Sequence, residues 1–399
     1  MPNAQPLFHG HESDQLLNIT IEEEQVQKKL RSLRIDKAAG ADDMSPRILV
    51  VSFPITCIMN DSIISGVVPD EWKSANVTPI HKSGSKGRVE NYRPISLTSQ
   101  ICKIQESIIR EAIIEHLDKY QLISNTQYGF RRGGSCLSNL IRFLNKVSGF
   151  LDTDECIDVI YLDFSKAFDK VPHCRLLEKL EKHGIGGNIK SWIQNWLSGR
   201  RQRVCVNGNC SAWRIVTSGV PQGSVLGPVL FLIYINDLES DIISSVYKFA
   251  DDTKLLGKVN NTNDRDLLQL DLKRMMDWSN LWQLPFNTSK CSVMHLGRNN
   301  NHYSYTVSSQ VLDVVKEVKD LRVFLTADMR PSRHCEEAYS KASRILGMIA
   351  RTITDRSQEV LIPLYKSVVR PHLEYCSPIW QSCCPRGLAL ASRILEDTS

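Results

Sequence analysis

The sequence has no apolar run long enough to cross a membrane. Its longest run, VLGPVLFLIYI at 225–235, is too short to span a bilayer and is interrupted by Gly227 and Pro228. The N-terminal stretch MPNAQPLFHGHESD is polar and contains no apolar segment of the kind found in secretory signals. We therefore expect no membrane partner, and a cytoplasmic or nuclear location.

Regularly spaced cysteine pairs are also missing. The 12 cysteines stand singly, apart from the neighbours Cys383 and Cys384, and none forms a CxxC motif. This pattern argues against a structural zinc site. Because no export signal is visible, we expect the cysteines to be reduced thiols.

Charge of one sign is not in large excess. The formal net charge is +5, which does not by itself indicate a nucleic-acid partner. Hydrophobic residues make up 42% and charged residues 23% of the sequence, as in ordinary globular proteins. The 399 residues suffice for two or three domains, and no fixed-period repeat is present.

A central group of strand patterns is flanked by helical patterns. A capping box at Thr20 and Glu23 begins the first predicted helix. We predict helices at about 20–40, 99–118, 173–183, 188–197, 223–238, 264–282 and from 333 onward. We predict strands or hairpins at 157–163, 202–217, 246–257 and 318–326. This arrangement favours the α+β class with a helical C-terminal part.

Two adjacent aspartates, Asp251 and Asp252, stand at the predicted turn of the hairpin at 246–257, and Asp163 closes the predicted strand IDVIYLD. Half-buried carboxylates repel one another unless a cation compensates them. Mg²⁺ prefers carboxylate and phosphate oxygens, and two such ions stabilise an in-line phosphoryl displacement. A plain turn is the alternative interpretation, because aspartate favours turns.

Three longer motifs bear on this choice. They are YLDFSKAFDKVPH (161–173), GVPQGSVLGPVLFLIYINDL (219–238) and KFADDTKLL (248–256), in that order. The chain resembles the reverse transcriptases of non-LTR (LINE-type) retrotransposons, in which such segments are motifs A, B and C. Further blocks that resemble the family are GADDMSPRIL (40–49), NYRPISLTS (91–99), QYGFRRGGSC (127–136), NTSKCSVMHLGR (287–298) and SQEVLIPLYKSVVRPHLEYC (357–376).

The resemblance covers roughly residues 30 to 380 and implies a right-hand polymerase with fingers, a palm built on an antiparallel sheet, and a partial helical thumb. We accordingly expect a disordered N-terminus at 1–19, an N-terminal extension with fingers at 20–156, a palm at 157–330, and a partial thumb and tail at 331–399. The reverse transcriptase domain as a whole would span about 63–330. No segment resembling the family's endonuclease is visible, so we expect a fragment of an element.

The resemblance implies an RNA-directed DNA polymerase, which adds nucleotides to a primer 3′-OH. Its partners would be an RNA template, a DNA primer and dNTPs. One alternative is a catalytically impaired remnant that only binds RNA or RNA–DNA hybrid. Another is an RNA-dependent RNA polymerase. The sequence leaves the oligomeric state open.

The resemblance assigns the carboxylates to metal binding. Asp163 and Asp251 would be the principal ligands of two Mg²⁺ ions, with Mn²⁺ as a possible substitute, and Asp252 would be a weaker ligand. Lys290, in TSKC, matches a lysine that serves as a candidate general acid for pyrophosphate departure. Its alternative role is that of an ordinary surface lysine.

Other residues match positions around the incoming nucleotide. Phe168 matches the steric gate that rejects a 2′-OH, and its alternative role is a packed core aromatic. Gln222 matches a glutamine that lines the nucleotide pocket, and Gly223 would allow a close approach of the backbone to base or template. The alternative is a plain Pro-Gln-Gly turn. Arg93 and Lys82 would reach the triphosphate from the fingers, and the alternative role of Lys82 is that of a solvated loop lysine.

Five arginines are candidate contacts to nucleic-acid phosphates, with a solvated basic loop as the alternative. They are Arg131, Arg132, Arg200, Arg201 and Arg203. One departure from the family is Arg322, in KDLRVFL, where glycine is usual. We expect a strand here, beside the primer grip, and a long side chain that disturbs the primer end.

Overall fold

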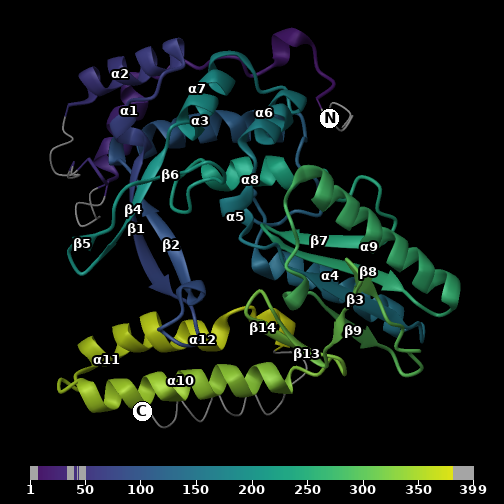
Figure 1. The fold of residues 1–399 in the computed structure, drawn as a ribbon. Coiled ribbons are helices and arrows are strands. Elements are labelled where there is room, and N and C mark those ends of the chain that lie inside the picture. The colour runs from purple at the N-terminus through teal and green to yellow at the C-terminus, as the bar shows by residue number, and fades with distance from the viewer. Residues whose placement is uncertain (1–7, 34–39, 43, 45–50, 381–399) are drawn as a thin grey trace. The chain divides into compact units, whose positions relative to one another are not determined.

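The computed structural model describes residues 8–33, 40–42, 44 and 51–380. The chain forms two compact units, each assembled from three segments of the sequence. The first unit comprises residues 1–130, 164–241 and 275–286, and the second comprises 131–163, 242–274 and 287–399. The elements confirm the α+β class (Figure 1). The boundaries expected for fingers, palm and thumb remain a prediction.

The first unit combines a small mixed sheet with helices. Its helices are α1 (Glu23–Arg31), α2 (Ser52–Ser65), α3 (Gln100–Lys119), α5 (Ala167–Lys170), α6 (His173–Lys182), α7 (Gly187–Leu197) and α8 (Gly227–Ile235). Its strands are β1 (Ser74–His81), β2 (Tyr92–Leu97), β4 (Arg201–Val206), β5 (Asn209–Cys210) and β6 (Arg214–Ile215), in the order β2-β1-β4-β5 with β6 also paired to β4. Strand β1 runs antiparallel to β2 and parallel to β4.

Helix α8 is buried along its length because GPVLFLIYI is apolar on every side. It confirms the buried helix predicted at 223–238, with shorter bounds. The long helix α9 (Thr262–Trp282) begins in the second unit and ends in the first.

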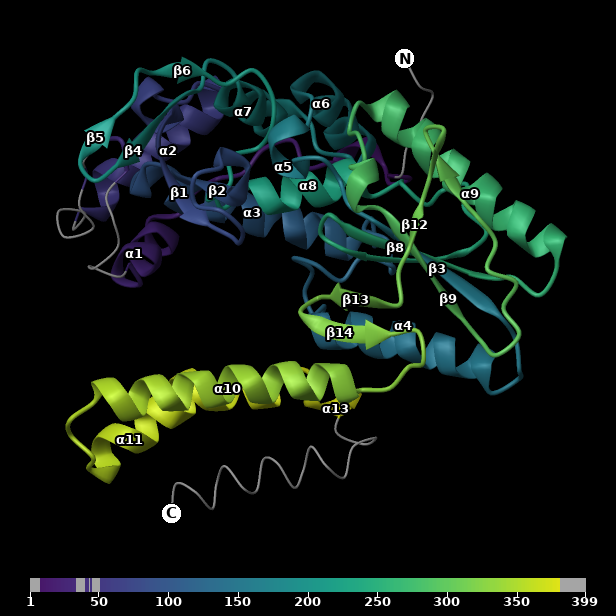
Figure 2. The same cartoon turned by 60° about the horizontal axis from the view of Figure 1, so that its bottom comes forward.

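The second unit is built on a five-stranded sheet in the order β12-β9-β3-β8-β7, of which Figure 1 labels β9, β3, β8 and β7 and Figure 2 labels β12. Its strands are β3 (Ile157–Leu162), β7 (Ser245–Phe249), β8 (Asp252–Lys258), β9 (Ser292–Leu296) and β12 (Asp313–Val314). Two separate hairpins are β10 (Thr306–Val307) with β11 (Gln310–Val311) and β13 (Glu317–Asp320) with β14 (Val323–Thr326). The central strand β3 is buried at every position and runs antiparallel to both β8 and β9.

Helices complete the second unit. They are α4 (Cys136–Leu151), α10 (Ser332–Thr352), α11 (Gln358–Leu364), α12 (Arg370–Glu374) and α13 (Ser377–Trp380), with a π-helical turn at 365–369. Phe143 of α4 packs in one core with Val159 of β3 and Leu325 of β14. This core joins the central sheet, α4 and the β13–β14 hairpin (Figure 2).

The N-terminal part is more ordered than expected. The ring of Phe8 is buried against the rings of His116 and Tyr120, and the backbone N–H of Leu16 donates to the carbonyl of Gly184. The expectation of disorder therefore fails for residues 8–19, because scattered apolar residues anchor the segment to the first unit. Residues 1–7 lie outside the described residues.

Helix α1 begins and ends differently from the prediction. Glu22 and Gln25 form its capping box, in place of Thr20 and Glu23, and the helix ends at Arg31 rather than near Gly40. The single strand predicted at 318–326 is instead the β13–β14 hairpin, with Leu321 and Arg322 as its turn. Both turn residues have positive φ, +44° and +70° respectively, which the sequence does not signal because neither is glycine or asparagine.

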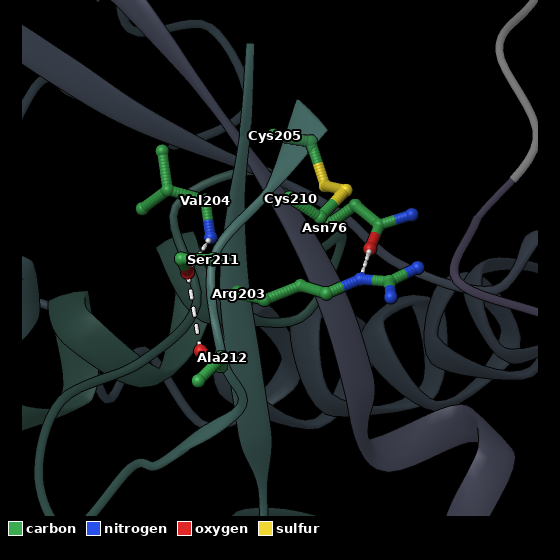
Figure 3. The surroundings of a disulfide bond; sticks show 7 residues. All are labelled: Asn76, Arg203, Val204, Cys205, Cys210, Ser211 and Ala212. Carbon is green, nitrogen blue, oxygen red and sulfur yellow. Dashed lines mark hydrogen bonds between the residues drawn. A yellow bond between two sulfur atoms is a disulfide. The ribbon is translucent and has the colours of Figure 1, made fainter. Parts of the chain in front are cut away.

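The cysteines were expected to be reduced, but Cys205 and Cys210 form a disulfide (Figure 3). They face each other across the β4–β5 hairpin, which the sequence predicts within 202–217 around the turn NGN at 207–209. The hairpin register brings two cysteines together that a search for CxxC pairs does not connect.

Among the residues described, no helix is both long and apolar enough to cross a membrane.

Candidate active site

The three candidate metal ligands lie at one end of the sheet in the second unit. Leu162, the last residue of β3, pairs with Thr253 of β8. Asp163 follows Leu162 and Asp252 precedes Thr253, so the two aspartates flank the last pair of this antiparallel register. Asp251 belongs to the two-residue turn that joins β7 to β8, so the predicted hairpin with FADD at its turn is confirmed.

The surroundings of Asp252 disfavour the ionised form of its carboxyl group. Its burial, followed by the nearby charges of Asp251, Asp320 and Asp163, raises the pKa of Asp252 to about 7, and Lys254 opposes the shift. The residue as a whole nevertheless retains an exposed surface, so solvent ions can reach it. Crowded oxygen ligands of this kind suit a hard divalent cation, which would relieve the repulsion.

Lys290 carries the cationic group nearest to Asp163. Its Nζ atom lies 2.8 Å from Oδ2 of Asp163, and both side chains are partly exposed. The backbone N–H of Asn287 also donates to the carbonyl of Asp163, at 2.7 Å, which fixes the start of the 3₁₀ turn η4 (Thr288–Lys290). In the ranges that the structure describes, no group of three or more His, Cys, Asp or Glu side chains has metal-ligand geometry. The carboxylate of Asp163 is instead paired with the ammonium group of Lys290.

Phe168 lies on α5 in the first unit and is half-buried. Its ring stacks on that of Phe231 of α8, with centroids 4.6 Å apart and planes inclined by 20°. This packing holds the ring rigidly, as a steric gate requires. The gate and core interpretations of Phe168 are therefore compatible.

Gln222 is fixed by two contacts within the first unit. Its Nε2 donates to Oδ1 of Asp169 at 3.1 Å, and its carbonyl accepts from the backbone N–H of Ser96 at 2.7 Å. Gly223 has φ +117°, and a Cβ there would lie 2.5 Å from the carbonyl oxygen of Ser96. The close backbone approach predicted for Gly223 is therefore made to strand β2. A contact with nucleic acid stays a prediction.

A cavity of about 300 Å³ in the first unit is lined by Gln222, Asp169, Lys166 and Arg201, among others. Burial raises the pKa of Asp169, while the hydrogen bond from Gln222 and the charges of Lys166 and Lys82 oppose that shift. Acidic and basic side chains thus line one cavity, as expected of a binding site for a polar ligand.

The remaining basic candidates fall into two groups by exposure. Arg93, Lys82 and Arg132 have exposed side chains, and Arg131 is intermediate. Arg200 differs, because only 2% of its surface is exposed and its Nη1 donates to the carbonyl of Trp196. The buried side chain of Arg200 fits neither the predicted contact with nucleic-acid phosphates nor the alternative of a solvated basic loop.

Arg201 and Arg203 lie two residues apart on β4, and strand β1 holds both side chains. Their Nε atoms donate to Ser74 and Asn76 of β1, each at 2.8 Å, and Figure 3 shows the contact between Arg203 and Asn76. Both guanidinium groups also lie near the ring of Trp213, at 5.1 and 4.6 Å from its centroid. The hydrogen bond through Nε fixes the orientation of each guanidinium group. A guanidinium group held in one orientation suits phosphate binding.

Three charged residues near these sites were not identified from sequence. Glu106 of α3 accepts from the backbone N–H groups of Val225 and Leu226, at 2.6 and 3.2 Å, just beyond the Pro-Gln-Gly turn. Lys254 and Asp320 form an ion pair beside Asp252. For Glu106 the sequence signal was a charged residue within the apolar pattern of the helix predicted at 99–118, whereas Lys254 and Asp320 stand among other polar residues.

Comparison with known proteins shows which family the chain resembles. Residues 80–349 match the family model described as "Reverse transcriptase (RNA-dependent DNA polymerase)". The RNA-directed DNA polymerase from mobile element jockey of Drosophila melanogaster is 29% identical over 90% of this chain and 41% of its own length. The probable RNA-directed DNA polymerase from transposon X-element of the same species is 27% identical over 83% of this chain and 37% of its own length.

A solved structure of apo telomerase from Candida tropicalis, truncated from its C-terminal domain, is also similar. It is 13% identical, with a TM-score of 0.46, over 68% of this chain and 59% of that chain. The present chain spans about two fifths of the length of the curated relatives named above. These relatives confirm the resemblance to non-LTR retrotransposon polymerases. Since the family model alone covers more than half of the sequence, the chain belongs to the reverse transcriptase family.

Proposed function

We propose that this chain catalyses RNA-directed DNA polymerisation, in which a primer 3′-OH attacks the α-phosphate of a dNTP on an RNA template. The observation that carries the proposal is the β3–β8 register, which brings Asp163 beside Asp252 and the turn residue Asp251. The residues come from sequence segments far apart, and a structural turn alone would not require their convergence.

Asp163, Asp251 and Asp252 would hold two Mg²⁺ ions, or Mn²⁺ in their place. When bound, such ions stabilise negative charge on the attacking and leaving oxygens. The raised pKa of Asp252 supports this assignment, because a cation would relieve the repulsion among these side chains. Lys290 would exchange its contact with Asp163 for the leaving pyrophosphate and donate a proton to it.

Other side chains would select and hold the substrates. Phe168 would exclude a 2′-OH, and Gln222 and Gly223 would line the site of the incoming nucleotide. The triphosphate would be bound by the exposed cations Arg93 and Lys82. Contacts to template or primer phosphates would be made by Arg131, Arg132, Arg201 and Arg203.

A catalytically impaired chain that only binds RNA or RNA–DNA hybrid is the second candidate. The observation that favours it is Arg322, whose exposed side chain occupies a left-handed turn position, φ +70°, where the family usually has glycine. Substrate binding without extension would distinguish this candidate from a polymerase.

The test is primer extension on poly(rA)/oligo(dT) with dTTP and Mg²⁺, together with the affinity for the same primer–template. We expect the parent chain to extend the primer and Asp163→Asn to abolish extension while leaving binding in place. Asp152→Asn is a matched control, because Asp152 is an exposed carboxylate at the end of α4 in the same unit. Tight binding by a parent chain that never extends a primer would instead support the binding-only candidate.

A further inference from the structure

Lys254 and Asp320 form an ion pair in the interior of the second unit. Lys254 lies on β8 with 4% of its surface exposed, and Asp320 ends β13 with 7% exposed. Removing two charges from water is costly, so such a pair persists only where its geometry is well satisfied. The sequence separates the two residues by 66 positions.

The surroundings of Lys254 satisfy its ammonium group. Besides the carboxylate of Asp320, Nζ donates to Oδ1 of Asn139 on α4 at 2.9 Å. The amide of Asn139 in turn donates to the carbonyl of Lys248 on β7 at 3.2 Å, and Nζ lies 4.7 Å from the ring centroid of Phe143. The lysine thus connects β8 with α4 and β13 through directional contacts.

This ion pair stands next to the catalytic carboxylates. Residues two apart on a strand project from the same face, so Lys254 shares a face of β8 with Asp252. Across the ladder, Lys254 pairs with Tyr161, which is two residues before Asp163. The turn formed by Leu321 and Arg322 follows immediately after Asp320. One side chain therefore links the strand of the metal ligands to this turn.

A second contact fixes the same turn. The hydroxyl of Tyr375 donates to the carbonyl of Leu321 at 2.9 Å. Apolar packing of Val323 and Leu325 holds the hairpin to the core. Such packing is non-directional and tolerates small displacements along the surface, whereas an ion pair with defined hydrogen bonds does not.

We propose that the buried Lys254–Asp320 pair is a positioning device, which holds the β13–β14 turn in register with the strand that carries Asp252. The inference rests on the proposed polymerase function and on the expectation from the family resemblance that this turn lies beside the primer grip. The pair acts through the turn and touches no substrate itself. A displacement of the primer end of about 1 Å would be enough to slow the chemistry strongly.

Single and double substitutions separate positioning from stability. Asp320→Asn removes one charge with little change in shape, and Lys254→Met/Asp320→Leu replaces both charges with apolar groups, which often preserves stability. The matched control is Lys179→Met, which breaks the Lys179–Asp237 pair of the first unit, where the two side chains are 1% and 14% exposed. Each variant is compared with the parent by thermal unfolding, by affinity for primer–template, and by single-turnover extension at saturating dNTP.

We expect Asp320→Asn to slow extension about a hundredfold while changing primer–template affinity little. The double variant should recover stability but not the extension rate. Lys179→Met should lose stability without a matching loss of rate. Extension by the double variant at the parental rate would overturn the inference.

A measurement without turnover keeps the two proposals separate. Hydrogen exchange of the backbone amides at 321–323 should accelerate about tenfold in Asp320→Asn and stay at the parental rate in Lys179→Met. Unchanged exchange at 321–323 in Asp320→Asn would overturn the positioning role, whatever the activity of the parent. A parent that never extends a primer would refute the proposed function, while the exchange data would still decide whether the pair anchors the turn.

Discussion

In the first unit, the two-residue turn between β4 and β5 consists of Asn207 and Gly208, with φ of +50° and +82°. In the second unit, the turn between β13 and β14 has the same length and consists of Leu321 and Arg322, with φ of +44° and +70°. Asparagine and glycine are the residues such a turn favours, whereas leucine and arginine pay a steric penalty in the left-handed region. The first turn is stabilised by its own sequence, and the second depends on its neighbours.

The β7–β8 turn follows the second pattern. Ala250 has φ +55°, where glycine would be less strained, and Asp251 is a candidate metal ligand. Both turns that the proposals connect with polymerisation thus contain residues at positive φ that do not favour it, while the β4–β5 turn has residues that do. Strain of this kind persists where the surrounding structure determines the backbone, as it does beside the Lys254–Asp320 pair.

The largest effect should come from removing a carboxylate at the β7–β8 turn. Asp251→Asn removes one carboxylate and should reduce extension by about a thousandfold or more, because a metal ligand is lost. Thermal stability should not fall, because asparagine fits turns and like-charge repulsion decreases. The matched control Ala250→Gly should keep most of the activity. Parental activity in Asp251→Asn would exclude Asp251 as a metal ligand.

Arg322→Gly should have a smaller effect of opposite sign. Glycine relieves the left-handed strain and removes the long side chain beside the turn, so extension should become several-fold faster, about tenfold at most. Stability should equal or exceed that of the parent, because relief of strain offsets the greater freedom of glycine in the unfolded chain. Rates and melting temperatures measured side by side test this. A slower variant would mean that arginine itself binds the primer.

Asp252, which follows the β7–β8 turn, should make the free energy of unfolding depend on pH, an effect that the β4–β5 and β13–β14 turns should not have. The pKa of Asp252 is raised to about 7 in the folded chain, so the folded state binds more protons than the unfolded state between about pH 4 and pH 7. This carboxyl group therefore lowers stability as pH rises through that window. Millimolar Mg²⁺ at pH 8 should reverse the loss, and Asp252→Asn should remove both effects in thermal unfolding. A melting temperature of the parent that Mg²⁺ does not change would contradict this prediction.

The smallest effect should come from disturbing the turn that obeys its local rules. Gly208→Ala adds a Cβ that meets open space, so its cost is the backbone strain alone, about 1 kcal/mol. We expect this loss in chemical denaturation and no change in extension rate. A loss of activity in Gly208→Ala would show that the β4–β5 hairpin takes part in catalysis.

The same contrast explains which features the sequence could predict. Asn207 with Gly208 predicts its hairpin correctly, because the residues that form the turn also signal it. Leu321 with Arg322 carries no such signal, so the sequence suggested a continuous strand. Local propensity identifies a turn only where the turn is stabilised locally.

The candidate site divides in a similar way. Asp163, Asp251 and Asp252 were identified because they end apolar strand patterns within motifs that resemble a known family. Lys254 and Asp320 were missed, because their pairing depends on the packing of distant segments. Arg200 was grouped with its basic neighbours, although its side chain points to the interior.

The placement of β3 also constrains how the chain folds during synthesis. This fully buried strand at 157–162 pairs with β8 at 252–258 on one edge and with β9 at 292–296 on the other, and both partners are synthesised much later. A ribosome adding about 5–20 residues per second would leave both edges of an apolar strand unpaired for several seconds. The nascent chain therefore passes through an interval in which its most apolar strand is open to aggregation or to capture by chaperones.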